Sequence, residues 1–356
     1  MINKNIHLKK LKRSRILENR DLKYGLRLDR NEKIDNWDKQ KIINLIKKQP
    51  DSFFSTYPNI TNLYKKIAKH AKVKENQILV TNGIDGSIRH LLEHLTSPNK
   101  SIAVLSPTYA MYKVYAQILK LKIYELNYNN DLSINFDNLF KILNKNISVL
   151  FIPSPNQPID TKIDKDKLEK IITFAKRKNT YVVIDEAYFL FGMYSTIPFI
   201  KKHPNLFVMR TFSKGFGMPS IRVGYTVGSE INMNIISKSR IAHELGSLNI
   251  ILTEFLLDNI DIVKNNVKKI IEGRTYVKNQ LKKINIKAYG NYGNYLFIKL
   301  KSDKEVVSIN EYLSNKKIYI KASFSKPWSQ FILITIGPKK YMEKFIKEIN
   351  KFYLKK

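Results

Sequence analysis

Residues 149–188 read VLFIPSPNQPIDTKIDKDKLEKIITFAKRKNTYVVIDEAY. Two short apolar runs, 149–152 and 181–184, enclose residues 165–177, in which the apolar side chains recur with the spacing of an amphipathic helix. Short apolar runs are typical of buried strands, and the 3.6-residue period is typical of helices. The stretch therefore predicts a strand, a helix and a second strand, which is the unit that builds parallel sheets.

The same alternation continues on both sides of this unit. Apolar runs at 78–80, 102–105 and 206–209 predict further strands, and residues 86–95 and 109–119 have helical spacing. We therefore expect an α/β fold with a mostly parallel sheet.

The pattern changes after about residue 235. Long helical stretches are followed by predicted strands at 295–300, 317–320 and 331–336, and by a helix from Tyr341. We expect a large α/β domain at 45–240, and a small α+β domain formed by residues 1–44 with 241–356.

The charge of the chain is unusual. Its 356 residues include 63 Lys and Arg against 30 Asp and Glu, a net charge of +33. Such a charge is compatible with three kinds of anionic partner: nucleic acid, an anionic membrane and a phosphorylated substrate. The basic residues are spread along the chain, and Lys, Asn, Ile and Tyr are abundant together, as in proteins from AT-rich genomes. Our main interpretation is therefore that the charge reflects this compositional bias and not a particular partner. A basic nucleic-acid-binding protein on the same fold is an alternative from another class, although no recognition motif supports it.

Cysteine is absent, which excludes disulfides, thiolate nucleophiles and Cys-bound zinc or Fe–S clusters. No apolar run is long enough for a membrane span, and the basic start is not followed by an apolar signal core. We therefore expect a cytoplasmic protein without a membrane partner. His90 and His94 have the i,i+4 spacing of metal ligands but lack a third ligand, so no metal is expected.

Polar residues directly follow the predicted strands, at the sheet edge where open α/β folds bind their ligands. The turn at Gly83, Ile84 and Asp85 enters a helix and could hold a phosphate. Asp185 leaves a buried strand, where a carboxylate requires a cation or a strong donor. Lys214 in a Ser/Gly turn could react with a carbonyl cofactor, and the Arg222 guanidinium suits a phosphate.

Three motifs in this order, Asp185-Glu186-Ala187-Tyr188, Thr211-Phe212-Ser213-Lys214 and Arg222-Val223-Gly224-Tyr225, resemble the fold-type I pyridoxal-phosphate (PLP) aminotransferases. The similarity is strongest to the histidinol-phosphate aminotransferase family, which includes threonine-phosphate decarboxylases, and it extends from about Leu28 to the C-terminus. The resemblance implies the PLP-dependent transferase fold of type I with a seven-stranded sheet, bound pyridoxal 5'-phosphate and a homodimer.

The resemblance also implies roles for individual residues. Lys214 would form the Schiff base with the cofactor and move the α-proton of the substrate. Asp185 would face the pyridine nitrogen, and Tyr188 would hydrogen-bond the phenolic O3′. The remaining predicted cofactor-binding residues are Gly83, Ile84, Asp85, Tyr109, Asn156, Gln157, Ser213, Arg222 and, from the partner subunit, Tyr57.

The departures from the family pattern lie where the substrate is expected. Leu333 stands where the family has the arginine that binds the substrate's carboxylate or phosphate, and Lys321 replaces a second family arginine. Asn31 begins Asn31-Glu32-Lys33-Ile34, which replaces the family's Asn-Glu-Asn-Pro. The predicted substrate residues are Asn31, Arg30 and Lys321. Candidates to replace the missing cation are Arg30, Arg240, Lys321 and Lys326.

These features predict a class I/II aminotransferase that acts on an amino acid and on a small ketone or aldehyde, either phosphorylated or sugar-derived. Within the same fold, decarboxylation of a phospho-amino acid is the alternative.

Overall fold

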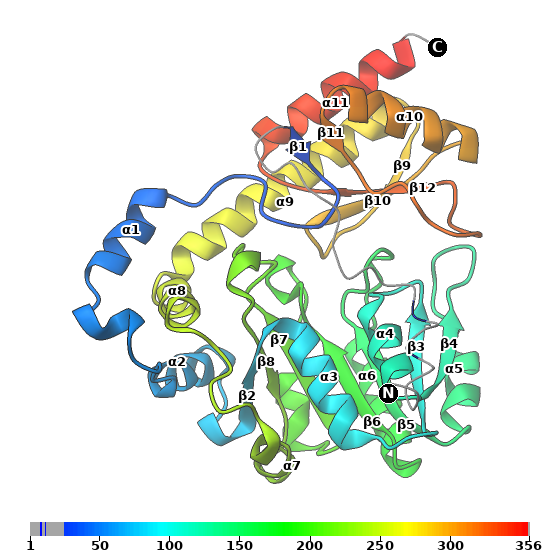
Figure 1. The fold of residues 1–356 in the computed structure, drawn as a ribbon. Helices are drawn as coiled ribbons and strands as arrows, with labels where there is room; N and C mark the ends of the chain where they lie inside the picture. The colour runs from blue at the N-terminus through cyan, green and yellow to red at the C-terminus, as the bar shows by residue number, and fades with distance from the viewer. Residues whose placement is uncertain (1–7, 9–10, 12–24, 355–356) are drawn as a thin grey trace.

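Seven strands form the large sheet of the computed structural model, which describes residues 8, 11 and 25–354 (Figure 1). Six of them run parallel, and β8 is antiparallel to both of its neighbours. In spatial order the strands are β2 (Ile78–Thr81), β8 (Gly224–Val227), β7 (Leu206–Thr211), β6 (Tyr181–Asp185), β5 (Ile147–Pro153), β3 (Ser101–Ser106) and β4 (Lys122–Asn127). The predicted mostly parallel seven-stranded sheet is confirmed.

Two of these strands carry no clear signal in the sequence. β4 lies at the edge of the sheet and is largely exposed, so it lacks an apolar run. β8 begins with a glycine and is four residues long, and its burial depends on the strands on either side.

Helices cover both faces of the sheet. One apolar cluster contains residues of α3 (Gly83–Leu95), α4 (Met111–Ile118) and α7 (Glu230–Ile236) together with Phe151 of β5. The larger cluster contains α2 (Thr61–Ala71), α5 (Phe136–Leu143), α6 (Lys165–Arg177) and the next residue of β5, Ile152. Because successive strand side chains point to opposite faces, these central strands are apolar throughout.

The helix boundaries differ slightly from the predicted ones. The structure places α6 at the predicted residues 165–177, whereas α4 begins two residues later than predicted. α3 begins three residues earlier, because Gly83 has a φ of 67° and turns the chain directly from β2 into the helix.

The C-terminal third forms a second layer (Figure 1). The layer contains the long α9 (Ile260–Lys283), α10 (Asp303–Asn315) and α11 (Lys339–Leu354), whereas α8 (Ser247–Asp258), which precedes α9, lies beside the layer that contains the large sheet (Figure 1). β9 (Lys287–Tyr289), β10 (Tyr295–Lys299) and β12 (Phe331–Thr335) make a separate antiparallel sheet with β10 in the centre.

The described N-terminal segment joins this second layer. β1 (Leu26–Arg27) pairs in parallel with β11 (Ile318–Tyr319), and the chain then continues into α1 (Lys39–Lys47). α8 nevertheless lies against α2, where Lys66 forms ion pairs of 3.1 Å with Glu254 and 2.5 Å with Asp258. The division into residues 45–240 and residues 1–44 with 241–356 therefore stays a proposal. Among the described helices, none is both long and apolar enough to cross a membrane.

Candidate active site

A cavity of about 350 Å³ lies at the carboxyl-terminal edge of the large sheet. The strand register explains why polar residues meet here, since Asp185 at the end of β6 lies beside Pro153 of β5 and Met209 of β7. The cavity is lined by Arg30, Glu32, Ile84, Asp85, Tyr109, Tyr112, Pro153, Pro155, Asn156, Gln157, Asp185, Ala187, Tyr188, Thr211, Ser213, Lys214, Pro219 and Arg222.

Most of the predicted site residues belong to this lining. They are Arg30, Ile84, Asp85, Tyr109, Asn156, Gln157, Asp185, Tyr188, Ser213, Lys214 and Arg222. Four predicted residues lie outside the lining. Gly83 and Asn31 are directly behind it, Tyr57 is 82% exposed on the surface of the subunit, and Lys321 belongs to the C-terminal layer.

Lys214 extends toward the N-terminal segment. Its Nζ donates to the backbone oxygens of Asn31 at 3.1 Å and Arg30 at 3.3 Å. Burial lowers the pKa of Lys214 to about 8, whereas the nearby Glu32 carboxylate acts in the opposite direction. A substantial fraction of the amine is therefore neutral near pH 8, which is the form that attacks a carbonyl carbon.

Asp185 is buried next to a tyrosine that sequence reasoning missed. The Tyr112 hydroxyl donates to Asp185 Oδ2 at 2.5 Å, and the backbone N–H of Ala187 donates to Oδ1 at 2.9 Å. Burial raises the pKa of Asp185 to about 6. The sequence predicts a helix across Tyr112 but contains no sign that its hydroxyl meets a carboxylate 73 residues away.

The adjacent Glu186 does not enter the cavity, since neighbouring residues at the end of a strand point to opposite faces. Its carboxylate forms a buried ion pair of 2.8 Å with Arg210 and accepts a hydrogen bond from the Thr196 hydroxyl. Asp185 is thus the acidic group that the strand end presents to the cavity.

An anion cradle lies at the start of α3. The first backbone N–H groups of the helix point outward there, and Arg222 Nη1 donates to Ser213 Oγ at 3.3 Å beside them. A Cβ atom on Gly83 would approach Arg222 Nη2 to 2.7 Å, so the absence of a side chain at Gly83 lets the guanidinium lie against the helix start. The Asp85 carboxylate forms an ion pair of 3.5 Å with Arg222 and accepts a hydrogen bond of 2.8 Å from the Tyr109 hydroxyl.

The proline-rich turn after β5 fixes Asn156 from several sides. Its Nδ2 donates to Pro107 O at 2.8 Å and to the Tyr128 hydroxyl at 3.0 Å, and its Oδ1 accepts from Thr108 at 2.7 Å. Asn156 is fully buried, so this amide holds the turn in place, and the adjacent Gln157 also lines the cavity.

Tyr188 connects the cavity to the N-terminal segment. Asn31 Nδ2 donates to the Tyr188 hydroxyl at 2.9 Å, and the backbone N–H of Asn31 donates to Thr335 Oγ1 of β12 at 2.8 Å. Asn31 therefore contacts the site twice, with its side chain at Tyr188 and with its backbone oxygen at Lys214.

Leu333 and Lys321 face each other across a backbone bridge in the C-terminal layer. Leu333 is fully buried in the apolar core, opposite Phe297 of β10. Lys321 is exposed, and its Nζ lies 5.1 Å from the centre of the Phe324 ring. The structure does not bring either side chain to the cavity.

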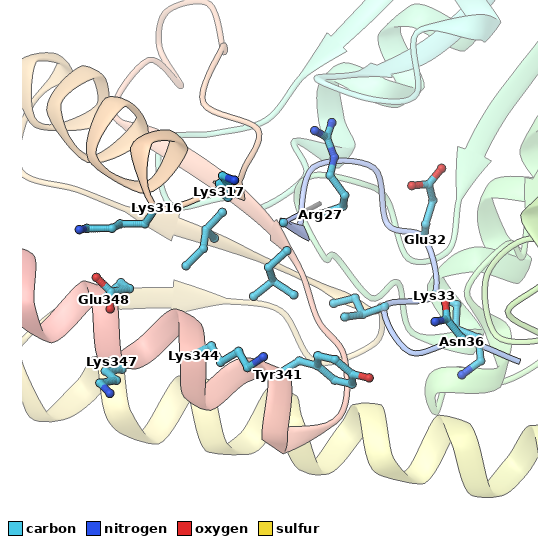
Figure 2. A pocket seen from close by; sticks show the side chains of 14 residues that line it. Arg27, Glu32, Lys33, Asn36, Lys316, Lys317, Tyr341, Lys344, Lys347 and Glu348 are labelled. Atoms are coloured by element: carbon cyan, nitrogen blue, oxygen red, sulfur yellow. The ribbon is translucent and has the colours of Figure 1, made fainter. Parts of the chain in front are cut away.

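A larger groove of about 770 Å³ lies on the other side of the N-terminal segment, between β11 and α11 (Figure 2). Arg27, Lys33 and Lys316 line it, but Arg27 is paired with Asp29 at 2.6 Å and Lys33 with Asp35 at 2.5 Å. It shares only Glu32 with the cavity at the sheet edge, among the residues that line the two hollows.

The two histidines with metal-ligand spacing contact backbone atoms. His90 Nε2 lies 2.7 Å from Ile236 O, and His94 Nδ1 lies 2.7 Å from His90 O. In the described part of the chain, no group of three His, Asp or Glu side chains could hold a metal ion.

The cavity fits pyridoxal phosphate chemically. Asp185 is a buried carboxylate in the cavity lining, and its negative charge would favour a protonated ring nitrogen. Lys214 supplies an amine, and the cradle at Gly83 and Arg222 supplies donors for a phosphate. The cavity volume lies in the ordinary range for small-molecule sites.

Comparison with known proteins defines the class to which this fold and site belong. Residues 25–349 match the family of class I and II aminotransferases. The histidinol-phosphate aminotransferase of Clostridium novyi is 30% identical over 92% of this chain and 91% of its own length. The enzyme of the same name from Sulfurisphaera tokodaii is 30% identical over 82% of this chain and 80% of its own.

Solved structures share the fold. The histidinol-phosphate aminotransferase of Sinorhizobium meliloti in complex with pyridoxal-5'-phosphate has a TM-score of 0.81 at 18% identity, covering 92% of this chain and 91% of its own. The L-threonine-O-3-phosphate decarboxylase of Porphyromonas gingivalis has a TM-score of 0.76 at 19% identity, covering 93% of this chain and 100% of its own.

The chain belongs to the class I and II aminotransferases. It is a pyridoxal-phosphate-dependent enzyme similar to the histidinol-phosphate aminotransferases.

Proposed function

We propose that the protein moves an amino group between an amino acid and a small phosphorylated or sugar-derived ketone or aldehyde, with Lys214 as the reacting amine. The observation that carries this proposal is the meeting of Lys214, Asp185 and Tyr188 in one cavity with an anion cradle at its edge. The names of the 30% identical relatives favour a phosphorylated substrate such as histidinol phosphate.

Pyridoxal phosphate, when bound, supplies an electron sink that stabilises negative charge at the substrate α-carbon. Gly83, Ile84 and Arg222 would hold its phosphate, and Asp185 would keep its ring nitrogen protonated. The Tyr188 hydroxyl, oriented by Asn31, would donate a hydrogen bond to the ring oxygen. Lys214 would remove the α-proton and return it, which its lowered pKa favours at neutral to mildly alkaline pH.

Decarboxylation is the second candidate, because the Porphyromonas gingivalis decarboxylase shares the fold. Both reactions begin with the same amine and cofactor, and they differ in whether the proton or the carboxylate leaves the α-carbon. The orientation of the substrate in the cavity decides between them.

A direct test incubates the purified protein with pyridoxal phosphate and then with amino donors and 2-oxo acids. We expect a yellow protein that transfers nitrogen from histidinol phosphate or a related amine, and a Lys214→Ala variant that has lost both colour and transfer. Carbon dioxide released from a phospho-amino acid without an acceptor would instead favour the decarboxylase. Wild-type protein that stays colourless with added cofactor would contradict the proposal.

A homodimer is part of the proposal. Several large apolar side chains are strongly exposed on the subunit surface, and a second subunit would cover those that lie at its interface. The exposed residues are Phe54, Tyr57, Ile231, Ile235 and Ile241. Tyr57, stacked on His243 at 4.3 Å between ring centres, would reach the cofactor phosphate of the partner subunit. The cytoplasmic location stays a prediction.

A further inference from the structure

The cavity contains three cationic side chains among the described residues that line it: Arg30, Lys214 and Arg222. Lys214 is the reacting amine. Arg222 lies at the start of α3, where it pairs with Asp85 and contacts Ser213. Arg30 is the arginine of this lining to which no role in cofactor binding has been assigned.

An aminotransferase must bind an anion beyond its cofactor, because every amino-acid donor carries a carboxylate. A carboxylate or phosphate in a partly enclosed cavity needs a cation, and an arginine provides two parallel N–H donors. The C-terminal layer does not supply one, since Leu333 is buried among apolar residues and Lys321 lies outside the cavity.

Of the four candidate cations, only Arg30 lies in the cavity lining. Arg240 lies at another hollow, where its Nε is 3.7 Å from Glu244. Lys321 lies over the Phe324 ring, and Lys326 is absent from the residues that line the cavity.

The backbone of Arg30 is held next to the reacting nitrogen. Its carbonyl oxygen accepts a hydrogen bond of 3.3 Å from Lys214 Nζ, so the side chain starts close to the place where the α-carbon must react. Neighbouring residues fix this position on both sides. Leu28 O accepts from Thr335 N at 2.7 Å, and Asn31 N donates to Thr335 Oγ1 at 2.8 Å.

The Arg30 side chain itself remains accessible. The side chain is 40% exposed, and its Nε lies 3.8 Å from Asp29 Oδ2. Glu32, which also lines the cavity, disfavours an anion on its own side.

We propose that Arg30 binds the carboxylate or phosphate of the amino substrate and thereby takes the place of a cation at position 333. This assignment rests on the proposed aminotransferase function. Arg30 is a specificity-determining residue on the N-terminal segment, and its contribution is to substrate affinity.

The experiment compares wild-type protein loaded with pyridoxal phosphate with Arg30→Gln, Arg30→Lys and Arg27→Gln. Arg27 is the matched control, because it is an arginine three residues away that lines the groove in Figure 2 and not the cavity. Dissociation constants for L-glutamate, O-phosphoethanolamine and butylamine are measured from the change in cofactor absorbance. Maleate, a dicarboxylate without an amine, is titrated by calorimetry.

We expect Arg30→Gln to weaken binding of the anionic ligands roughly ten- to hundredfold, because a charge-assisted contact is lost. Butylamine binding should not change, Arg30→Lys should restore part of the affinity, and Arg27→Gln should resemble the wild type. If Arg30→Gln weakens the binding of glutamate and maleate alone, Arg30 binds the carboxylate. If it weakens the binding of O-phosphoethanolamine alone, Arg30 binds the phosphate.

Two results would overturn the assignment. Loaded Arg30→Gln protein that binds all anionic ligands like the wild type would remove Arg30 from substrate binding while leaving the aminotransferase proposal intact. An equal loss of anion affinity in Arg27→Gln would show that the effect comes from the net charge of the protein and not from a contact made by Arg30. Wild-type protein that takes up no cofactor would overturn the proposed function and the Arg30 assignment together.

Discussion

At the scale of single residues, the site is built at a cost to the stability of the folded chain. Asp185 is ionised with difficulty because it is buried, and its pKa is about 6 against an ordinary 3.8. Below about pH 4 this carboxyl group is protonated in both the folded and the unfolded state and its titration does not change stability, whereas from pH 4 to pH 6 it increasingly destabilises the folded state, and the full penalty remains at higher pH. Active sites often retain such unfavourable groups because the chemistry requires them.

Asp185→Asn should therefore stabilise the cofactor-free protein at pH 7 by roughly 3 kcal/mol, which follows from the difference between the two pKa values. The increase in the free energy of unfolding over the wild type should grow from pH 4 to pH 6 and be absent at lower pH. Denaturant unfolding measured across this range checks it. With cofactor bound the gain should shrink, because the protonated ring nitrogen stabilises the Asp185 carboxylate.

Asp131→Asn is the control, since Asp131 is exposed and its pKa is lowered by hydrogen bonds from Ser133. It should give no stabilisation at any pH. An equal gain from both variants would show that the effect comes from the net charge and not from burial.

At the scale of elements, the position of α3 depends on β8. A Cβ atom on Gly224, the first residue of β8, would lie 2.7 Å from the carbonyl carbon of Gly83 and 2.9 Å from the backbone nitrogen of Ile84. These are backbone atoms at the helix start, so they cannot rotate away. The glycine thus lets the anion cradle lie directly against the sheet.

Gly224→Ala should destabilise the protein by about 1–3 kcal/mol, the usual cost of overpacking. It should also weaken retention of pyridoxal phosphate, because the N–H groups of α3 are displaced from Arg222. Unfolding curves and cofactor release during dialysis measure the two effects. Gly246→Ala, where the nearest atom to the new Cβ is 3.8 Å away and the residue caps α8, should leave cofactor retention unchanged. Normal cofactor retention in Gly224→Ala would refute the link between β8 and the cradle.

At the scale of the whole molecule, the surface position of Tyr57 links the proposed homodimer to catalysis, because Tyr57 could act only in the site of a partner subunit. Tyr57 is 82% exposed and lies outside the cavity of its own chain, so a role in the site requires a second subunit. The isologous contact expected of a two-fold dimer would place each Tyr57 near the other subunit's cavity.

Hybrid dimers test this arrangement. Lys214→Ala and Tyr57→Ala chains are each expected to be nearly inactive alone. Refolded together, they should recover about a quarter of the wild-type activity, because half of the dimers are mixed and each mixed dimer contains one intact site. Light scattering gives the oligomeric state. Absence of recovery in a sample that contains mixed dimers would place Tyr57 outside the shared site.

Much of the fold could be predicted because its signal is local. The central strands of the sheet are apolar on both faces, and α6 keeps its period over all the predicted residues. The edge strand β4 and the short β8 could not be predicted, because neighbouring strands define them. The residues of the cavity that follow β2, β5, β6 and β7 were predicted because parallel strands end at one edge.

The sequence by itself determined the order of the central strands β2, β3, β5, β6 and β7 and of the helices α3, α4 and α6, together with Asp185 and Lys214 after two of these strands and Arg222 in the motif that follows. These depend on periodicity and on short motifs. Only the tertiary structure decided that the Tyr112 hydroxyl binds Asp185, that Lys321 lies outside the cavity, and that the Arg30 backbone meets a lysine 184 residues away. Such contacts depend on how separate segments pack, and no local pattern in the chain encodes the distance between two side chains brought together by folding.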